Sequence, residues 1–255
     1  QVALVLLCIM TDLLLVVVYK ELRHNMTALN ISVTHNDDDG YVGIWTDGGE
    51  DSGNDNIFNN SASILRMGWD TENYTPDEYQ FYAWLRFQNV TIPAGATIDD
   101  AVIKVYHSAN TVTDSGSDPD EGMIVKAHDI NTAPRPANYA QVNGVTRASN
   151  TATTSSFIDV DNMEDFSGQY YSSADIKAII QEIVNGPASG GSWASGNDMV
   201  FYLYPASYSA DWQIDWVSKN AGSNPPKIEI NYTAAAAAAA AEPDLPGAAF
   251  LMFVD

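Results

Sequence analysis

Short oxygen-rich turns are the segments of this sequence whose residue types and spacing could do chemistry. Aspartate and asparagine cluster in residues 36–39 and again in residues 47–55. Calcium takes several oxygen ligands from flexible turns of this composition. Neither turn has the spacing of an EF-hand loop, so a solvated acidic surface is the alternative. The candidate ligands of a structural calcium are Asp37, Asp38, Asp39, Asp47, Asp51 and Asp55.

Aromatic side chains on strand-like segments could bind a sugar, because flat rings serve as platforms and neighbouring polar groups read hydroxyls. Trp193 lies in the glycine-rich segment GGSWASGN and is the best candidate for an exposed platform. The alternative for each aromatic residue is a place in the core or between sheets. The candidate ligand-binding residues are Trp193, Trp84, Tyr82, Trp212 and Trp216.

The sequence lacks the common signatures of hydrolytic enzymes. The four histidines form no HExxH motif, and no serine lies in a G-x-S-x-G elbow. No pair of carboxylates is set in the apolar surroundings that would raise the pKa of one of them, as a glycosidase requires. We therefore expect a protein without catalytic residues.

Charge and cysteine content narrow the partners further. The chain has 33 acidic and 11 basic residues, a formal net charge of -22, which would repel nucleic acid and anionic lipid surfaces. A single cysteine, Cys8, allows neither an intramolecular disulfide nor a thiolate zinc cluster. Stability must come from a hydrophobic core.

An apolar run from Val2 to Val18 is close to the shortest length that spans a bilayer as a helix. We expect residues 1–25 to form a single-pass membrane anchor. A carboxylate in a membrane helix usually faces a protein partner, so Asp12, with Leu13 and Leu14, is expected to contact another subunit. Lys20 and Arg23 after the run favour a cytoplasmic domain under the positive-inside rule. The β-rich sequence that follows favours a domain facing the periplasm, the cell exterior or a virion surface.

From residue 26 to residue 233 the chain alternates β-branched and aromatic runs with Gly, Asn, Asp and Ser clusters, which is typical of antiparallel strands. In one run Phe81, Ala83, Leu85 and Phe87 share a face that we expect to line the core, as in a half-buried strand. The predicted strands are Ala28–Thr34, Tyr41–Thr46, Ser63–Gly68, Gln80–Val90, Ala101–Ser108, Met123–Ile130, Ser155–Asp159, Asp198–Tyr204, Asp211–Val217 and Lys227–Tyr232.

One amphipathic helix interrupts the strands. Isoleucines at 176, 179, 180 and 183 have helical spacing, Ser173 is the predicted cap, and Gly186 follows the end. Residues 234–255 follow the β-rich region and contain eight alanines and a short apolar stretch, Ala248–Val254. This stretch is too short to cross a membrane and is expected to act as a docking strand or a contact peptide. The sequence thus divides into an anchor (1–25), a β domain (26–233) and a tail (234–255).

The motif Leu85–Arg86–Phe87, followed by Ile92–Pro93, Gly95–Ala96 and Ile98, resembles the DNRLRE-type domains, which are also described among carbohydrate-binding modules and occur in phage structural proteins. The resemblance covers about residues 30–233. It implies an antiparallel, jelly-roll-like β-sandwich with a display or binding role.

Two functions compete on these grounds. The first is a structural or accessory subunit of a surface, envelope or membrane assembly, joined to other subunits through the apolar helix; a virion or filament protein is a variant of it. The second is an extracellular module that binds polysaccharide. A membrane-length segment containing Asp12 beside an otherwise soluble β domain, together with the apolar tail Ala248–Val254, favours the first.

Overall fold

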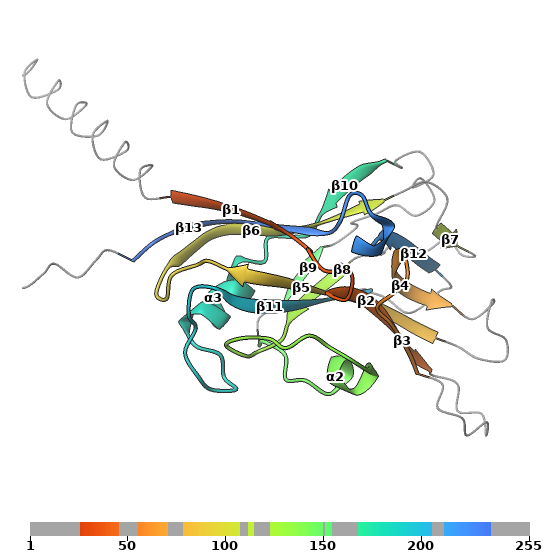
Figure 1. Ribbon diagram of the computed structural model, residues 1–255, viewed down its shortest axis with the longest axis horizontal. Helices are drawn as coiled ribbons and strands as arrows, with labels where there is room; N and C mark the ends of the chain where they lie inside the picture. The colour runs from red at the N-terminus through yellow and green to blue at the C-terminus, as the bar shows by residue number, and fades with distance from the viewer. Residues whose placement is uncertain are drawn as a thin grey trace, which may run out of the picture.

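The computed structural model describes residues 26–45, 56–70, 79–107, 112–114, 123–149, 151–154, 168–205 and 212–235. These residues form an all-β fold in which two antiparallel sheets pack against each other, with few helices (Figure 1). The predicted fold class is confirmed at this level. Nine of the ten predicted strands are present with shifted ends, and Ser155–Asp159 lies outside the described residues.

The smaller sheet has the strand order β1-β13-β6-β10. Strand β13 lies between β1 and β6, so the first and last strands of the described chain are neighbours. Met26 lies opposite Thr233, and Ser32 lies opposite Lys227. The strands are β1 (Met26–Ser32), β6 (Thr97–His107), β10 (Gln169–Ser172) and β13 (Lys227–Thr233).

The larger sheet has the order β7-β12-β4-β5-β11-β8-β9, and β2 joins it by pairing with β5 and β3. The long strand β5 organises this sheet because β2, β4 and β11 all pair with it. Its strands are β2 (Asp39–Trp45), β3 (Ile57–Asn59), β4 (Ile64–Asp70), β5 (Tyr79–Val90), β7 (Val112–Asp114), β8 (Met123–Ala127), β9 (Ala152–Thr154), β11 (Asn197–Pro205) and β12 (Trp212–Val217).

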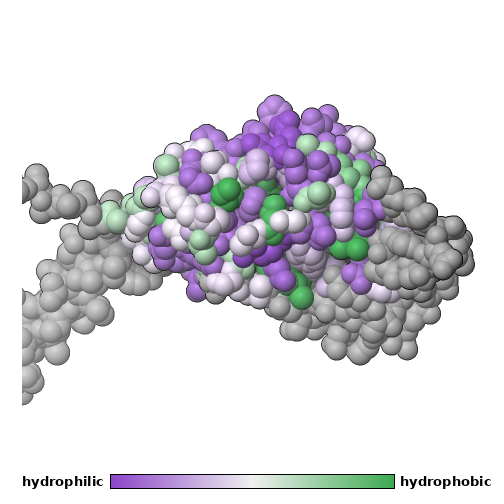
Figure 2. Space-filling view, turned by 90° about the horizontal axis from the view of Figure 1, so that it is seen from below, coloured by the Kyte–Doolittle hydropathy of each residue, from purple (hydrophilic) through white to green (hydrophobic). Residues whose placement is uncertain are grey.

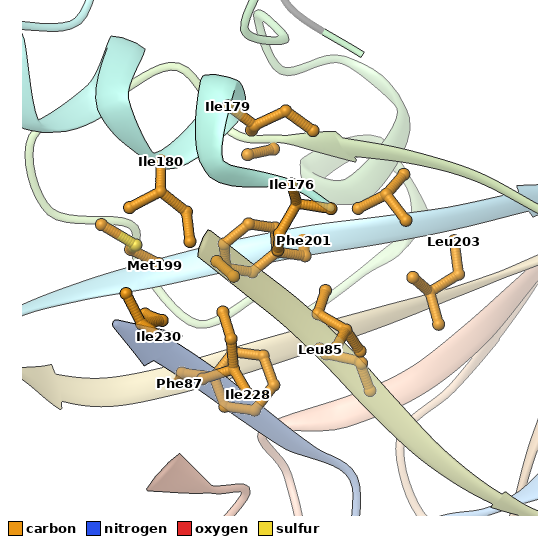
Figure 3. Close-up of a cluster of buried hydrophobic side chains, with 14 of the residues drawn as sticks. Leu85, Phe87, Ile176, Ile179, Ile180, Met199, Phe201, Leu203, Ile228 and Ile230 are labelled. Carbon is orange, nitrogen blue, oxygen red and sulfur yellow. The ribbon is translucent and has the colours of Figure 1, made fainter. Parts of the chain in front are cut away.

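The main core fills the space between the two sheets. Leu85 and Phe87 on β5 meet Ile228 and Ile230 on β13, and all four are at most 1% exposed (Figure 3). Each such side chain contributes roughly 1.5–3 kcal/mol through removal of apolar surface from water. The predicted core face of β5 is therefore confirmed for Ala83, Leu85 and Phe87, whereas Phe81 is buried in a separate cluster with Tyr41 and Tyr79.

The opposite face of β5 is also buried, which the half-buried pattern did not predict. Tyr82 and Trp84 are 1% and 0% exposed and belong to a second apolar cluster. The segment of residues 130–147, called here the outer strap, covers this face and contains α2 (Tyr139–Asn143), whose cap is Asn138. The larger sheet is thus covered on both sides here, so polarity alone could not identify its solvent face.

The predicted helix is α3 (Lys177–Asn185), with Ile179, Ile180 and Ile183 buried against the main core. The prediction that Ser173 caps it is wrong. The Ser173 hydroxyl instead accepts the backbone N–H of Ile103 in β6, at 3.0 Å. Asp175 accepts the N–H of Lys177, the first helical residue, and that of Ala101, so one carboxylate joins the helix to the sheet. A short 3₁₀ turn, η2 (Lys219–Ala221), follows β12.

Candidate functional site

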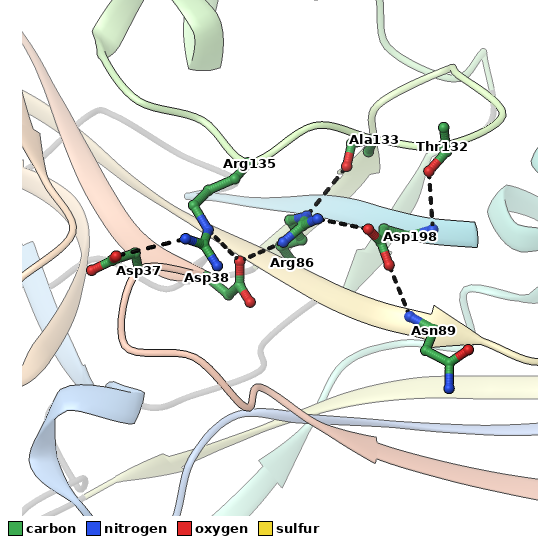
Figure 4. Close-up of polar contacts among 8 residues, drawn as sticks. All are labelled: Asp37, Asp38, Arg86, Asn89, Thr132, Ala133, Arg135 and Asp198. Atoms are coloured by element: carbon green, nitrogen blue, oxygen red, sulfur yellow. Dashed lines mark hydrogen bonds and ion pairs between the residues drawn. The ribbon is translucent and has the colours of Figure 1, made fainter. Parts of the chain in front are cut away.

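The acidic turn before β2 is held by arginines. Asp38 is fully buried, and its Oδ1 accepts Arg86 Nη1 at 2.7 Å and Arg135 Nε at 2.8 Å (Figure 4). Arg86 comes from β5 and Arg135 from the outer strap. The turn, the sheet and the strap therefore meet at one carboxylate.

Arg86 is the centre of this network. Its Nη2 donates to Asp198 Oδ2 at 2.6 Å, and its Nε donates to the carbonyl of Ala133 at 3.2 Å. Asp198 in turn accepts the N–H of Asn89, a residue with φ of 53°, in the left-handed region. The guanidinium geometry suits several oxygen acceptors at once. We call Asp38, Arg86, Arg135 and Asp198 the arginine clamp.

The structure gives different partners to Asp37, Asp38 and Asp39, three of the predicted calcium ligands. Asp37 is exposed and reaches Arg135 at 3.7 Å, Asp38 is occupied by two guanidiniums, and Asp39 accepts the N–H of Lys219 at 2.7 Å. Asp37 lies in a turn, Asp38 in the bend after it, and Asp39 begins β2, and each carboxylate has a different set of partners. Within the part of the chain that is described, no three His, Cys, Asp or Glu side chains form a metal-binding group. Asp47, Asp51 and Asp55 lie outside the described residues.

Asp39 is a buried carboxyl group with an unusual titration. It is 0% exposed, and its Oδ1 has no hydrogen-bond partner among the described residues. Burial raises its pKa to about 7, the bond from the Lys219 N–H opposes this, and the neighbouring Asp38 adds to it. Loss of hydration disfavours the charged form in this position.

The predicted aromatic pair Tyr82 and Trp84 lies in the second apolar cluster. Tyr82 stacks on Tyr204 with ring centroids 4.5 Å apart, and Trp84 stacks on Phe58 at 6.1 Å. Tyr202 lies directly opposite Trp84 in the pairing of β11 with β5. These rings form a continuous aromatic face, but the outer strap covers it.

Arg147 fastens the strap to this face. Its guanidinium lies 3.8 Å from the centroid of the Tyr202 ring and donates to the Tyr204 hydroxyl. It also donates to the carbonyls of Val142 and Val145 within the strap. A cation–π contact in a partly dehydrated position contributes about 2 kcal/mol. The aromatic face and the strap are therefore one packed unit.

The expectation that Trp193 is an exposed platform is wrong. Trp193 is 3% exposed, lies in the main core, and donates from Nε1 to the carbonyl of Ile92 at 2.8 Å. Gly190, Gly191 and Gly196 have positive φ, which lets the loop turn the indole inward. Trp216 is also a core residue at 0% exposed, and the Trp212 side chain lies outside the described residues.

A small aromatic site that the sequence did not single out lies on the outer face of the smaller sheet. Tyr106 on β6 and Tyr170 on β10 are opposite one another, with ring centroids 5.1 Å apart. Lys227 on β13 lies 4.7 Å from the Tyr170 ring centroid, and the Tyr170 hydroxyl donates to the Pro225 carbonyl. Both tyrosines are half-buried. The alternation of side chains along Thr97–His107 places Tyr106 on the outward face. This alternation is the sequence signal that could have identified the site.

Seen from below, the described surface is mainly hydrophilic, with apolar residues scattered over it (Figure 2). Met26, at 50%, is the one large hydrophobic residue classed as exposed within the described ranges.

The predicted assembly contacts Asp12, Leu13 and Leu14 lie outside the described residues. Among the helices that are described, none is long and apolar enough to cross a membrane.

Comparison with known protein families finds no family model that matches the chain. A search of curated proteins finds no match either.

Proposed function

We propose that this protein is a non-catalytic structural or accessory subunit of a surface, envelope or membrane assembly, in which the β domain is displayed. The observation that carries this proposal is the pairing of Met26 with Thr233. It puts the start and the end of the β domain side by side (Figure 1). Residues 1–25 and the tail are therefore joined to the β domain at neighbouring points, which supports attachment at one end of the domain and display of the rest.

The interior of the domain supports a structural role. The arginine clamp and Arg147 join segments that are distant in sequence, and the tryptophans that could have served as binding platforms at positions 84, 193 and 216 are buried. These contacts favour one rigid shape. Rigidity suits a displayed or assembled domain.

The proposal extends to attachment and location. Residues 1–25 would anchor the chain in a membrane through an apolar helix and contact other subunits through Asp12, with the β domain in the periplasm, at the cell exterior or on a virion surface. Jelly-roll connectivity and a relationship to the DNRLRE-type domains belong to the same proposal, and they are supported by the Leu85–Arg86–Phe87 motif.

The native mass of the particle in mild detergent tests this function. We expect the full chain to run in a large particle, and the chain lacking residues 1–25 to run as a monomer. Asp12→Leu should release the chain from the particle, because it removes the polar contact to a partner helix, whereas Thr11→Ala is the matched control and should not. A full-length chain that is monomeric from the outset would contradict the proposal.

Polysaccharide binding is the second candidate, and the pair Tyr106 and Tyr170 is the observation that favours it. Half-buried rings beside Lys227 could stack on a sugar and donate to its hydroxyls. Tyr106→Ala should then abolish binding on a glycan array, while Tyr139→Ala on the outer strap should leave it unchanged. An absence of glycan binding by the unmodified chain would eliminate this candidate.

A further inference from the structure

Strand β1 is an edge of the smaller sheet. The order β1-β13-β6-β10 puts it at one end, and among the described strands it pairs with β13 alone. The backbone groups of an edge strand that point away from its neighbour are available to another strand. An edge strand is therefore a place where a further segment can add.

Nothing in β1 protects this edge. Its sequence, MTALNIS, contains no charged residue, proline or glycine. Natural proteins usually protect an edge with charge, proline or a bulge, because an uncharged regular edge pairs readily with other strands. Met26, the exposed methionine, begins this strand. These features are expected of an edge that has a partner.

The core beside β1 is incompletely covered. Leu29 and Ile31 pack against the main core but are only partly buried, whereas their cross-strand partners Ile230 and Ile228 are each 1% exposed. A further strand beside β1 would cover the open side of Leu29 and Ile31. Its inward side chains must be apolar to do so.

We propose that the segment Ala248–Val254 of the same molecule adds to β1 as a fifth strand of the smaller sheet. The segment AAFLMFV has seven residues, the length of β1, and is uncharged. Side chains alternate between faces in a strand, so the inward set is either Phe250, Met252 and Val254 or Leu251 and Phe253. Both sets are apolar, so either register covers Leu29 and Ile31.

The connection is long enough for this return. Residues 234–247 can extend over about 46 Å, and traversing the whole of β1 requires only about 24 Å. Thr233 lies beside Met26, so the connection begins at the edge itself. A tethered segment has an effective concentration of roughly millimolar, and the net charge of -22 opposes approach of a second copy. These two terms favour the molecule's own tail over that of a neighbour.

Hydrogen–deuterium exchange of the full chain in mild detergent tests the inference. The variant Met252→Asp/Phe253→Asp puts a charge on each face of the tail strand, and Ala238→Asp/Ala239→Asp adds the same charge in the connection as a control. We expect amides of Met26–Ser32 to exchange about tenfold faster in the tail variant and at the unmodified rate in the control. Amides of β5 should be unchanged in both, which separates loss of the added strand from general destabilisation.

Three outcomes would overturn the inference. The first is an equal exchange rate of the β1 amides in all three proteins, and the second is an equal acceleration by both variants. The third is a loss of β1 protection on dilution that accompanies the dissociation of a dimer, because this would assign the added strand to a neighbouring copy. The inference does not rest on the assembly role. Particle mass tests the assembly role, and amide protection of β1 tests the addition of the tail strand.

Discussion

The Arg86 guanidinium donates across 2.7 Å to Asp38, a carboxylate that is wholly removed from solvent. The two residues are 48 positions apart, and Arg86 lies in the Leu85–Arg86–Phe87 motif. A buried charge is tolerated only when it is paired and hydrogen-bonded. The arginine of this motif is therefore a structural residue in this chain.

Replacing Arg86 should destabilise the fold strongly. Arg86→Met leaves Asp38 buried without this partner and should lower the free energy of unfolding by about 3–5 kcal/mol. Urea denaturation measures the change. The matched control is Lys177→Met, which breaks the exposed pair with Asp175 and should change stability by less than about 1 kcal/mol. Similar effects of the two variants would contradict a buried clamp.

Asp39 should make the protein less stable as pH rises. Its pKa is about 7 in the folded state and about 3.9 when unfolded, so between these values the folded state binds more protons. The contribution of Asp39 to stability is therefore complete below about pH 4 and is lost as pH rises to about 7. Asp39→Asn should remove this part of the slope in urea denaturation from pH 4 to 8. Asp37→Asn, at an exposed carboxylate of the same turn, should keep it.

Trp193 should matter for stability. Trp193→Ala removes a buried indole and should lower the free energy of unfolding by about 3–5 kcal/mol. Trp193→Phe retains most of the packing but leaves the Ile92 carbonyl without its donor, and should lower it by about 1–3 kcal/mol. Thermal denaturation orders the two variants. The control is the neighbouring Ser192→Ala, at an exposed position, which should leave the stability almost unchanged. If Trp193→Ala also left the stability unchanged, the indole would not be a core residue in solution.

Arg147 should control how firmly the outer strap is closed. Arg147→Met loses the contact with the Tyr202 ring and the donors to Val142 and Val145, a loss of about 2 kcal/mol in local stability. Limited proteolysis within residues 130–147 should then be about thirtyfold faster. Lys126→Met, beside the Tyr204 ring at 5.5 Å, is the control and should change cleavage only slightly. Unchanged cleavage in Arg147→Met would show that apolar packing alone holds the strap.

Patterns with a regular period were predictable. The alternation in Gln80–Val90 identified the core face of β5, and the isoleucine spacing identified α3. Short strands such as β3 and β10 were not predicted, because three or four residues carry too little periodicity to distinguish them from turns. The outer strap was also missed, since its residues have no strand or long-helix pattern and their burial depends on the sheet beneath them.

The sequence by itself determined the all-β class, most strand positions and the amphipathic helix, because these follow from local propensity and from the period of apolar residues. Only the tertiary structure decided which polar residues meet. Arg86 contacts Asp38 and Asp198, which are 48 and 112 positions away in the sequence, and Trp193 turns inward from a loop whose glycines have positive φ. Pairings of this kind depend on how strands from distant parts of the chain come side by side, and no local pattern carries that information.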